Sequence, residues 1–390
     1  MVFHKSLHLL PRPLITPKQI NILENWEDNP DRYVQFDPIL GWSIRPNAQA
    51  TIEGQHYTAN SSGIRALREY PLERVSGLTR IATFGPSFTH GDEVSDKETW
   101  QVQMEQTSPN LEVMNWGVGG YGTDQAFLRY RLQGQAYQPD IVIIGFEENN
   151  LNRNVNRFRP FFHQDTGIPL TKPVFVAESE GLRLIDNPFS DLPTLKQALL
   201  DEPHHFLDLV CPEDYYCRRA EYEPHLLDVF KSYRFLRTLA YELRSIDQPD
   251  PSPTVGQTID GWQLNEVELT NWRLIQMFVA EIVGNGSTPV IVAFPDRSSI
   301  EALEQGYDQA TFYRQGIIFL RQQSLHIVDV APAFVADKAA TNRPYADYYA
   351  PDGGHFNALG NSLVSQAVLT YLCEQIILAN CQPSEQLSEK

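Results

Sequence analysis

Short apolar runs alternate with longer amphipathic stretches in the first half of the chain. Residues 81–84, 111–114 and 140–145 are predicted strands, and residues 97–106 and 124–133 are predicted helices. The third strand is the strongest, because it is a continuous β-branched run of the kind that is buried on both faces of a sheet. Strands that alternate with helices in this way indicate a parallel sheet covered by helices on both sides.

The same alternation resumes in the last third of the chain. Residues 289–294 and 326–330 are predicted strands, and residues 266–283, 313–321 and 358–378 are predicted helices, the last of them long and amphipathic. Together with the three earlier strands, these two complete a five-stranded parallel sheet. We therefore expect a three-layer α/β/α domain.

The two alternating regions divide the chain into segments. We expect an irregular N-terminal cap over residues 1–78, which are rich in Pro, Asn, Tyr and Trp and lack helical periodicity. The α/β core is expected over residues 79–150 and 265–380, followed by a tail over residues 381–390. Residues 151–264 interrupt the alternation, and we expect them to form an insertion that shapes the pocket.

The insertion carries three local patterns of its own. Residues 174–177 and 182–185 flank the turn sequence Glu-Ser-Glu-Gly, which predicts a β-hairpin. Residues 226–245 predict a helix, and residues 248–253 form a proline-rich linker.

Composition places the chain among ordinary globular proteins and narrows its partners. The 390 residues carry a formal net charge of −18 and 42% are hydrophobic, which excludes a disordered or collagen-like chain. The acidic balance argues against a nucleic-acid or anionic-membrane partner, since phosphate binding needs a basic face. No apolar run of about eighteen residues occurs, so no transmembrane segment is predicted. The apolar stretch at the N-terminus is too short for a signal peptide, so we expect a cytoplasmic protein.

The four cysteines fall into two local pairs, Cys211 with Cys217 and Cys373 with Cys381. An even number of cysteines would suit disulfides outside the cell. Because so long a chain carries so few of them, we expect thiols instead. Neither spacing matches a zinc site, and we expect no metal and no organic cofactor.

Chemically useful residues follow the ends of the predicted strands. Ligands bind beyond the carboxyl ends of parallel strands, so the residues after each strand are the ones to inspect. A serine, a glycine-rich turn, a pair of amides and an Asp-x-x-His sequence all fall at that edge or just before the last helix. They are Ser87, Gly120, Asn149, Asn150, Asp352 and His355. These are the parts of a Ser-His-Asp hydrolase with an oxyanion hole.

Each of the three triad residues has a chemical role in this interpretation. The hydroxyl of Ser87 is a poor nucleophile until a base takes its proton, and His355 is the candidate base. Asp352 lies three residues before His355, across a Gly-Gly turn, and is the candidate carboxylate that fixes the tautomer of the imidazole.

The oxyanion of a tetrahedral intermediate needs hydrogen-bond donors that are already in place. The candidates are the backbone N–H groups of Ser87 and Gly120 and the side-chain amide of Asn150 or Asn149. We favour Asn150 of the two amides, and both stay open.

These motifs resemble those of the SGNH (GDSL-type) family of esterases and lipases. That family carries a Gly-Asp-Ser nucleophile motif, a later Gly, a later Asn and a C-terminal Asp-x-x-His in this order. Here Ser87 matches the nucleophile, Gly120 matches the oxyanion glycine, and Asp352 and His355 match the terminal pair. The resemblance implies a flavodoxin-like arrangement of the sheet and hydrolysis of a carboxylic ester.

The resemblance covers residues 80–155 and 285–378, with one departure at the nucleophile. The family's Gly-Asp-Ser is Gly85-Pro86-Ser87 here. Proline removes a backbone donor and a carboxylate from the nucleophile turn. The proline therefore leaves open a non-catalytic binding or scaffold protein derived from an esterase. An O-acyltransferase on the same triad also stays open, because the sequence does not separate water from another acyl acceptor. The expected ligand is a small-molecule ester or an acylated carbohydrate or lipid.

We predict that the remaining polar residues are neither catalytic nor metal-binding. Glu147 and Glu148 are adjacent at a strand end and point opposite ways, which disfavours a glycosidase pair. His90 is expected to be a loop residue rather than the base. His204 and His205 are expected to be solvated in a loop-like region rather than to bind a metal.

Overall fold

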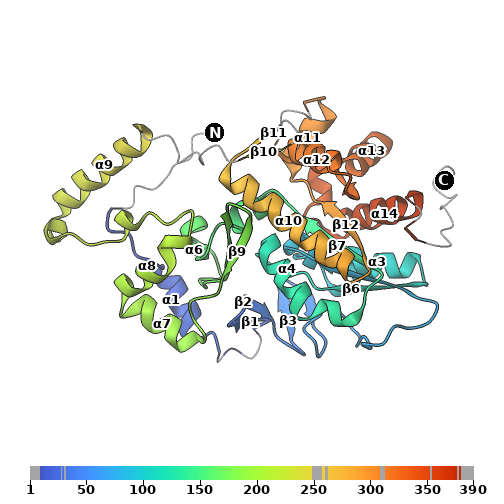
Figure 1. Ribbon diagram of the computed structural model, residues 1–390, viewed down its shortest axis with the longest axis horizontal. Coiled ribbons are helices and arrows are strands. Elements are labelled where there is room, and N and C mark those ends of the chain that lie inside the picture. Colours follow the sequence, from blue (N-terminus) through green and yellow to red (C-terminus); the bar gives the residue numbers. More distant parts are fainter. Residues whose placement is uncertain are drawn as a thin grey trace. The chain divides into compact units, whose positions relative to one another are not determined.

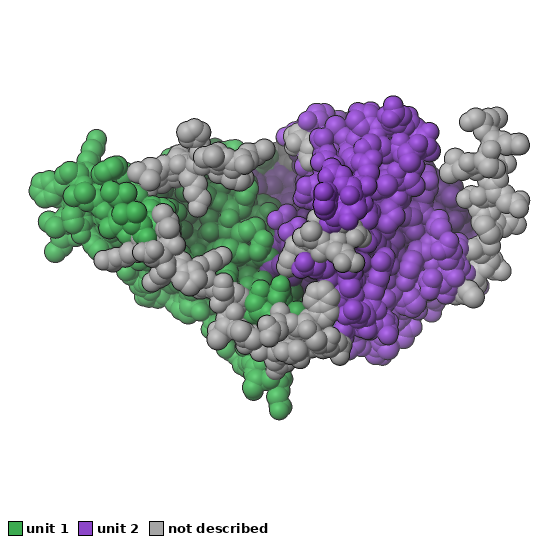
Figure 2. All heavy atoms as spheres, turned by 90° about the horizontal axis from the view of Figure 1, so that it is seen from above, with its two compact units in different colours: residues 1–29, 36–42, 152–273 green, residues 30–35, 43–151, 274–390 purple. Residues whose placement is uncertain are grey.

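The chain forms two compact units in the computed structural model (Figure 1). The first comprises residues 1–29, 36–42 and 152–273, and the second comprises residues 30–35, 43–151 and 274–390 (Figure 2). The structure describes residues 9–27, 29, 32–247, 257–259, 262–307, 312–351, 354–375 and 377–378.

A five-stranded sheet forms the centre of the second unit, in the order β13-β12-β7-β5-β6. Every neighbouring pair in it is parallel. The strands are β5 (Thr79–Phe84), β6 (Leu111–Asn115), β7 (Ile141–Phe146), β12 (Thr288–Ala293) and β13 (Ile327–Asp329). The predicted five-stranded parallel sheet is therefore confirmed, with each strand within two residues of its expected bounds.

Helices cover both faces of this sheet. They are α3 (Trp100–Thr107), α4 (Thr123–Leu132), α10 (Glu266–Gly284), α11 (Arg297–Glu304), α12 (Phe312–Gln322), α13 (Ala331–Thr341) and α14 (Ala358–Glu374). Adjacent side chains of β5 show the two layers, because successive residues of a strand face opposite sides. Phe84 packs against Tyr130 of α4 and Phe278 of α10, whereas the Thr83 hydroxyl accepts a hydrogen bond from Gln101 of α3. The fold is the expected three-layer α/β/α sandwich.

Strand β7 is the buried spine of the sheet. Its first four residues, which are the β-branched run of the sequence, are at most 1% exposed. It pairs with β12 along its whole length, from Ile141 opposite Thr288 to Phe146 opposite Ala293. Each buried aliphatic side chain of this size stabilises the fold by about 1.5–3 kcal/mol.

The N-terminal region is more regular than its composition predicts. It contains the helix α1 (Pro17–Glu24) and four strands: β1 (Val34–Asp37), β2 (Gly41–Ile44), β3 (Gln49–Ile52) and β4 (Gln55–Thr58). Strands β3 and β4 form an antiparallel hairpin. Helix α1 starts with a capping box, in which Thr16 and Gln19 each accept from the other's backbone N–H. A Thr-x-x-Gln sequence of this kind favours the start of a helix, and it outweighs the weak helical periodicity of this region.

The first unit contains the predicted β-hairpin, formed by β8 (Val174–Glu178) and β9 (Gly181–Ile185). The predicted helix over residues 226–245 is a 3₁₀ turn, Leu226–Val229, followed by α9 (Lys231–Asp247). Further elements here or at its border are α5 (Asn149–Arg153), α6 (Arg159–Phe162), α7 (Leu192–Leu200), α8 (Pro203–Val210), β10 (Gln257–Ile259) and β11 (Trp262–Leu264). The proline-rich linker lies outside the described residues.

The expectation of free thiols is wrong. Cys211 and Cys217 form a disulfide with their Cα atoms 5.2 Å apart. Cys373 is also disulfide-bonded, and no described cysteine is free. The first pair can close because Cys211 begins a short 3₁₀ helix, Cys211–Glu213, which turns the chain back within six residues.

No helix among the described residues is both long enough and apolar enough to cross a membrane.

Candidate active site

Ser87 lies just beyond the carboxyl end of β5, at the first position of the short helix α2 (Ser87–His90). The turn before it is packed against the end of β7. A Cβ atom at Gly85 would collide with the Thr89 hydroxyl and would lie 2.9 Å from the Gly145 carbonyl oxygen. A side chain at Gly145 would strike the same hydroxyl. The two glycines therefore let the nucleophile turn approach the sheet closely.

Two of the three polar groups of Ser87 are without partners among the described residues. Its hydroxyl makes no hydrogen bond there, and its backbone N–H donates none. Its carbonyl oxygen accepts from the N–H groups of Gly91 and Asp92, at 2.7 and 3.0 Å. The backbone around Ser87 is therefore held, while its nucleophilic oxygen and its amide donor are available for a substrate.

His355 lies beside the residue that follows Ser87. The rings of His355 and Phe88 are in contact, with their centroids 5.0 Å apart. The backbone of His355 is held by its carbonyl oxygen, which accepts from the N–H of Ala350 at 2.8 Å. No hydrogen bond joins the side chains of Ser87 and His355. Catalytic hydrogen bonds are often long or poorly aligned before substrate binds. Asp352, the expected third member, lies outside the described residues.

A carboxylate that the sequence analysis missed is bonded to His355. The Nδ1 atom of His355 lies 2.6 Å from Oε1 of Glu93. Glu93 follows Ser87 by six residues, directly after α2. The only sequence signal for it was the Asp-Glu pair that follows the nucleophile motif.

The acidic surroundings of His355 favour its charged form. Burial alone would lower the pKa of His355. The hydrogen bond to Glu93 and the negative charges of Asp92, Glu93 and Glu147 outweigh burial, so the pKa of His355 lies above its ordinary value. A base with a raised pKa in a site of this kind is suited to taking a proton from a serine.

The turn that carries Glu93 is clamped by Arg65, which is 3% exposed. The hydroxyl of Tyr57 accepts from the backbone N–H of Glu93 at 2.7 Å, and the Arg65 guanidinium lies over the Tyr57 ring. The guanidinium also donates to four oxygen atoms around the turn. These are His90 O at 2.9 Å, Gly91 O at 2.5 Å, Val94 O at 2.6 Å and Asp96 Oδ1 at 3.1 Å.

His90 closes helix α2 and is not the loop residue that the sequence suggested, because Pro86 O accepts its N–H and completes a helical turn. Its ring is buried, with Nδ1 2.5 Å from Asp92 and Nε2 3.3 Å from the Tyr33 hydroxyl. Burial and the nearby Arg65 lower the pKa of His90. Both ring nitrogens are thus engaged in packing the turn, as expected for a residue that is not the base.

The candidate oxyanion residues lie on the two neighbouring loops. Gly120 adopts a positive φ of 80°, a turn conformation that glycine reaches without strain. Its loop is tied to the nucleophile turn, because the N–H of Val118 donates to the Gly85 carbonyl at 3.0 Å. Asn150 is fully buried at the start of α5, and its amide donates to the Thr123 hydroxyl at 3.2 Å.

Asn149, the alternative to Asn150, is exposed, and its amide lies 3.4 Å from a carboxylate oxygen of Glu147. Glu147 is buried and Glu148 is exposed, which agrees with the expectation that these adjacent side chains point opposite ways. Although Glu148 is exposed as a residue, partial desolvation of its carboxyl group and the negative charges of Asp296 and Glu147 raise its pKa.

His204 and His205 lie exposed on helix α8, not in a loop, because Pro203 starts that helix directly before them. Among the described residues, no group of three or more His, Cys, Asp or Glu side chains is placed to hold a metal ion.

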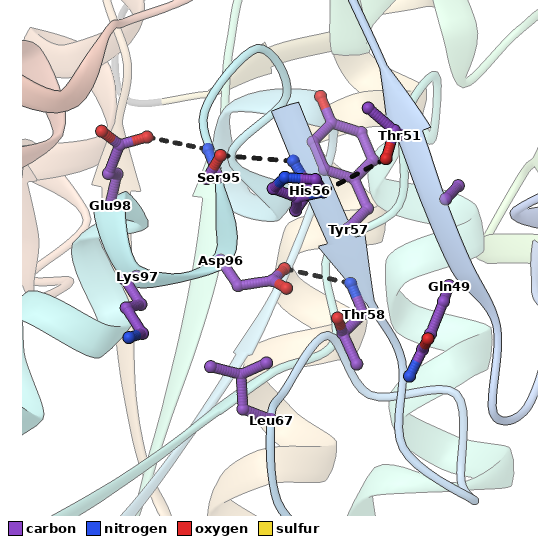
Figure 3. A pocket seen from close by; sticks show the side chains of 11 residues that line it. Gln49, Thr51, His56, Tyr57, Thr58, Leu67, Ser95, Asp96, Lys97 and Glu98 are labelled. Atoms are coloured by element: carbon purple, nitrogen blue, oxygen red, sulfur yellow. Dashed lines mark hydrogen bonds between the residues drawn. The ribbon is translucent and has the colours of Figure 1, made fainter. Parts of the chain in front are cut away.

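Two cavities flank the segment that follows Glu93. The larger, of about 820 Å³, is bounded by β3, β4 and the segment from Ser95 to Glu98 (Figure 3). Its wall is held by hydrogen bonds across the two sides, from Thr58 N–H to Asp96 at 3.1 Å and from His56 N–H to Ser95 at 3.2 Å (Figure 3). The smaller, of about 380 Å³, is lined by Glu93 itself. Its other lining residues are Gln55, Val94, Glu98, Ala350, Pro351, Asn357, Ala358 and Leu359.

No protein-family model matches the chain, and no curated protein matches it. The structure is similar to a member of the lipolytic protein G-D-S-L family from Veillonella parvula (TM-score 0.34, 10% identity, 75% of this chain and 97% of that one). It is also similar to a lipase/acylhydrolase from Enterococcus faecalis (0.35, 12%, 76% and 97%). An acetyl xylan esterase from Geobacillus stearothermophilus is a third neighbour (0.35, 13%, 75% and 94%). Likeness at this level assigns no activity to the chain.

Proposed function

We propose that this chain hydrolyses carboxylic esters, with Ser87 as the nucleophile and His355 as the general base. One observation carries the proposal. At the carboxyl end of a parallel sheet, a serine with an unbonded hydroxyl and N–H is followed by Phe88, whose ring contacts a histidine that is bonded through Nδ1 to a carboxylate. A carboxylate on Nδ1 fixes the tautomer that leaves the Nε2 lone pair available to take a proton.

The reaction proceeds in two stages. The oxygen of Ser87 bonds to the ester carbonyl carbon while its proton moves to Nε2 of His355. The tetrahedral intermediate collapses when the bond to the leaving alkoxide breaks and His355 returns the proton to that oxygen. A water molecule, deprotonated by the same imidazole, then attacks the acyl-serine; the bond between the acyl carbon and the Ser87 oxygen breaks, His355 returns the proton to that oxygen, and the acid is released. The sequence motif predicts Asp352 as the carboxylate that orients this imidazole.

The negative charge of the intermediate rests on the carbonyl oxygen. We assign its stabilisation to the N–H groups of Ser87 and Gly120 and to the amide of Asn150. The bond from Asn150 to Thr123 leaves one amide hydrogen of Asn150 for the substrate, since a side-chain amide has two. The substrate class is a small-molecule ester or an acylated carbohydrate or lipid.

A fluorophosphonate probe tests this proposal directly, because it reacts only with an activated serine. Purified wild-type protein should be labelled, with the adduct on Ser87 in a peptide digest, and should hydrolyse p-nitrophenyl acetate. Absence of both labelling and hydrolysis would contradict the esterase proposal and favour a non-catalytic binding protein. Labelling with product formed only when an alcohol acceptor is added would favour the acyltransferase.

Disulfide bonds bear on the compartment. They persist mainly outside the reducing cytosol. The bond between Cys211 and Cys217 and the bonded state of Cys373 therefore favour an oxidising compartment over the cytoplasm that the N-terminal sequence suggested.

Replacing Pro86 with aspartate should accelerate acylation of Ser87. Pro86 is the N-cap of α2 and provides no side-chain cap. An aspartate there can accept a backbone N–H of the first turn, and such a cap is worth about 1 kcal/mol, so we expect a gain of up to about fivefold. The measurement is the single-turnover acylation rate.

Pro344 is a matched control. Like Pro86 it is an N-cap without a side-chain cap, but it precedes a 3₁₀ helix, Tyr345–Tyr348. Pro344→Asp should leave the rate unchanged. A Pro86→Asp rate equal to wild type would show that proline is neutral in the turn before Ser87.

A further inference from the structure

Glu93 is placed by the fold to act on the base. We infer that Glu93, and not Asp352, is the carboxylate that holds His355 in its catalytic orientation. The inference rests on the proposed function for its catalytic meaning, whereas the pairing of the two side chains can be tested without any activity.

The contact itself has the geometry of a charge-assisted hydrogen bond. Nδ1 of His355 and Oε1 of Glu93 are 2.6 Å apart, and both side chains are largely buried, at 22% and 17% exposed. In a neutral imidazole whose Nε2 is unprotonated, the ring hydrogen is on Nδ1. The carboxylate that accepts this hydrogen selects the tautomer and orients the ring.

The backbone of Glu93 is held in an uncommon conformation. Its φ is 69°, in the left-handed region that few residues other than glycine occupy. Such conformations persist where the surroundings over-determine them, and they are concentrated at functional sites. Here the surroundings are visible: Tyr57 accepts the Glu93 N–H, and Arg65 binds the carbonyl oxygens on both sides of Glu93.

The electrostatic surroundings agree with this role. Among the described residues, the negative charges of Glu93, Asp92 and Glu147 act on His355, and of these three carboxylates Glu93 alone is hydrogen-bonded to it. Asp92 is instead bonded to His90. The second oxygen of Glu93, Oε2, is buried and has no described partner, so little competes with His355 for this carboxylate.

The test compares Glu93→Gln with Asp352→Asn, and uses Glu98→Gln as a matched control. Glu98 lines the same small cavity, but its carboxylate accepts a hydrogen bond from the backbone N–H of Ser95 and is not bonded to His355. The readouts are kcat/KM for p-nitrophenyl acetate across pH and the rate of fluorophosphonate labelling. We expect Glu93→Gln to lower kcat by about 10³–10⁴-fold, as when the orienting carboxylate of a serine triad is neutralised. Asp352→Asn should cost less than about tenfold, and Glu98→Gln should match wild type.

The pH profile separates this role from simple structural support. A neutral glutamine removes a charge that raises the pKa of His355, so the acid limb of kcat/KM should move to lower pH in Glu93→Gln. NMR titration of labelled histidine should show the same fall for His355 without any substrate. Neither shift is expected in Asp352→Asn or Glu98→Gln.

The outcomes are distinct. A large loss and a pKa fall in Asp352→Asn, with Glu93→Gln near wild type, would overturn the inference, as would equal effects in both. If wild type is not labelled, the proposed function fails, and the NMR titration still decides whether Glu93 holds His355. If Glu93→Gln does not fold, Glu93→Asp keeps the charge with a shorter reach and should still lower kcat more than Asp352→Asn does.

Discussion

Alanine at position 87 should abolish turnover of p-nitrophenyl acetate and leave the fold intact. Removal of the nucleophile of a serine triad costs about 10⁶-fold in kcat in a characterised case. The hydroxyl of Ser87 bonds to no described residue, so its loss should change the unfolding midpoint little. Ser232 lies exposed on helix α9 of the other unit, and Ser232→Ala serves as the control with wild-type turnover.

A second substitution tests whether Ser87 and His355 act together. Adding His355→Ala to Ser87→Ala should reduce turnover hardly further, because members of one catalytic unit are strongly non-additive. Wild-type turnover in Ser87→Ala would remove Ser87 as the nucleophile. Multiplying losses in the double variant would mean that the two residues act independently.

The sheet could be predicted from the chain because its strands carry their own signal. The run from Ile141 to Ile144 is apolar on both faces, and the structure buries both. Once parallel strands are assigned, the loops after them must meet at one edge. That rule brought Ser87, Gly120 and the pair Asn149 and Asn150 into one prediction, and the structure places each of them after the end of a strand of one sheet.

The partner of His355 could not be predicted in this way. Glu93 and His355 are 262 positions apart in the chain. Their contact depends on how one turn is bent and clamped by Arg65, which is a tertiary effect that no local pattern encodes. The Asp-x-x-His motif pointed to Asp352, because proximity in sequence is the only proximity that a motif can report.

The buried clamp should be one of the most sensitive points of the second unit. Arg65→Met removes a guanidinium that is paired with Asp96 and donates to three backbone carbonyls. The substitution leaves the Asp96 charge and those carbonyls buried without their donor. Removing one partner of a buried ion pair costs about 3–5 kcal/mol, so we expect a loss of that size in the free energy of unfolding. Equilibrium unfolding in urea measures it.

A neighbouring arginine provides the control for this prediction. Arg68 is 46% exposed and pairs with Glu105, and an exposed pair of this kind contributes at most about 1 kcal/mol. It also lies 3.5 Å from the buried Glu112, but that carboxylate keeps its partner Arg80 when Arg68 is replaced. Arg68→Met should therefore cost far less stability than Arg65→Met. Since the Arg65 clamp also sets the turn of Glu93, Arg65→Met should lower kcat even at temperatures where the variant is fully folded. Equal stability losses in the two variants would mean that burial of the Arg65 pair contributes nothing special, and unchanged kcat in folded Arg65→Met would disconnect the clamp from the base.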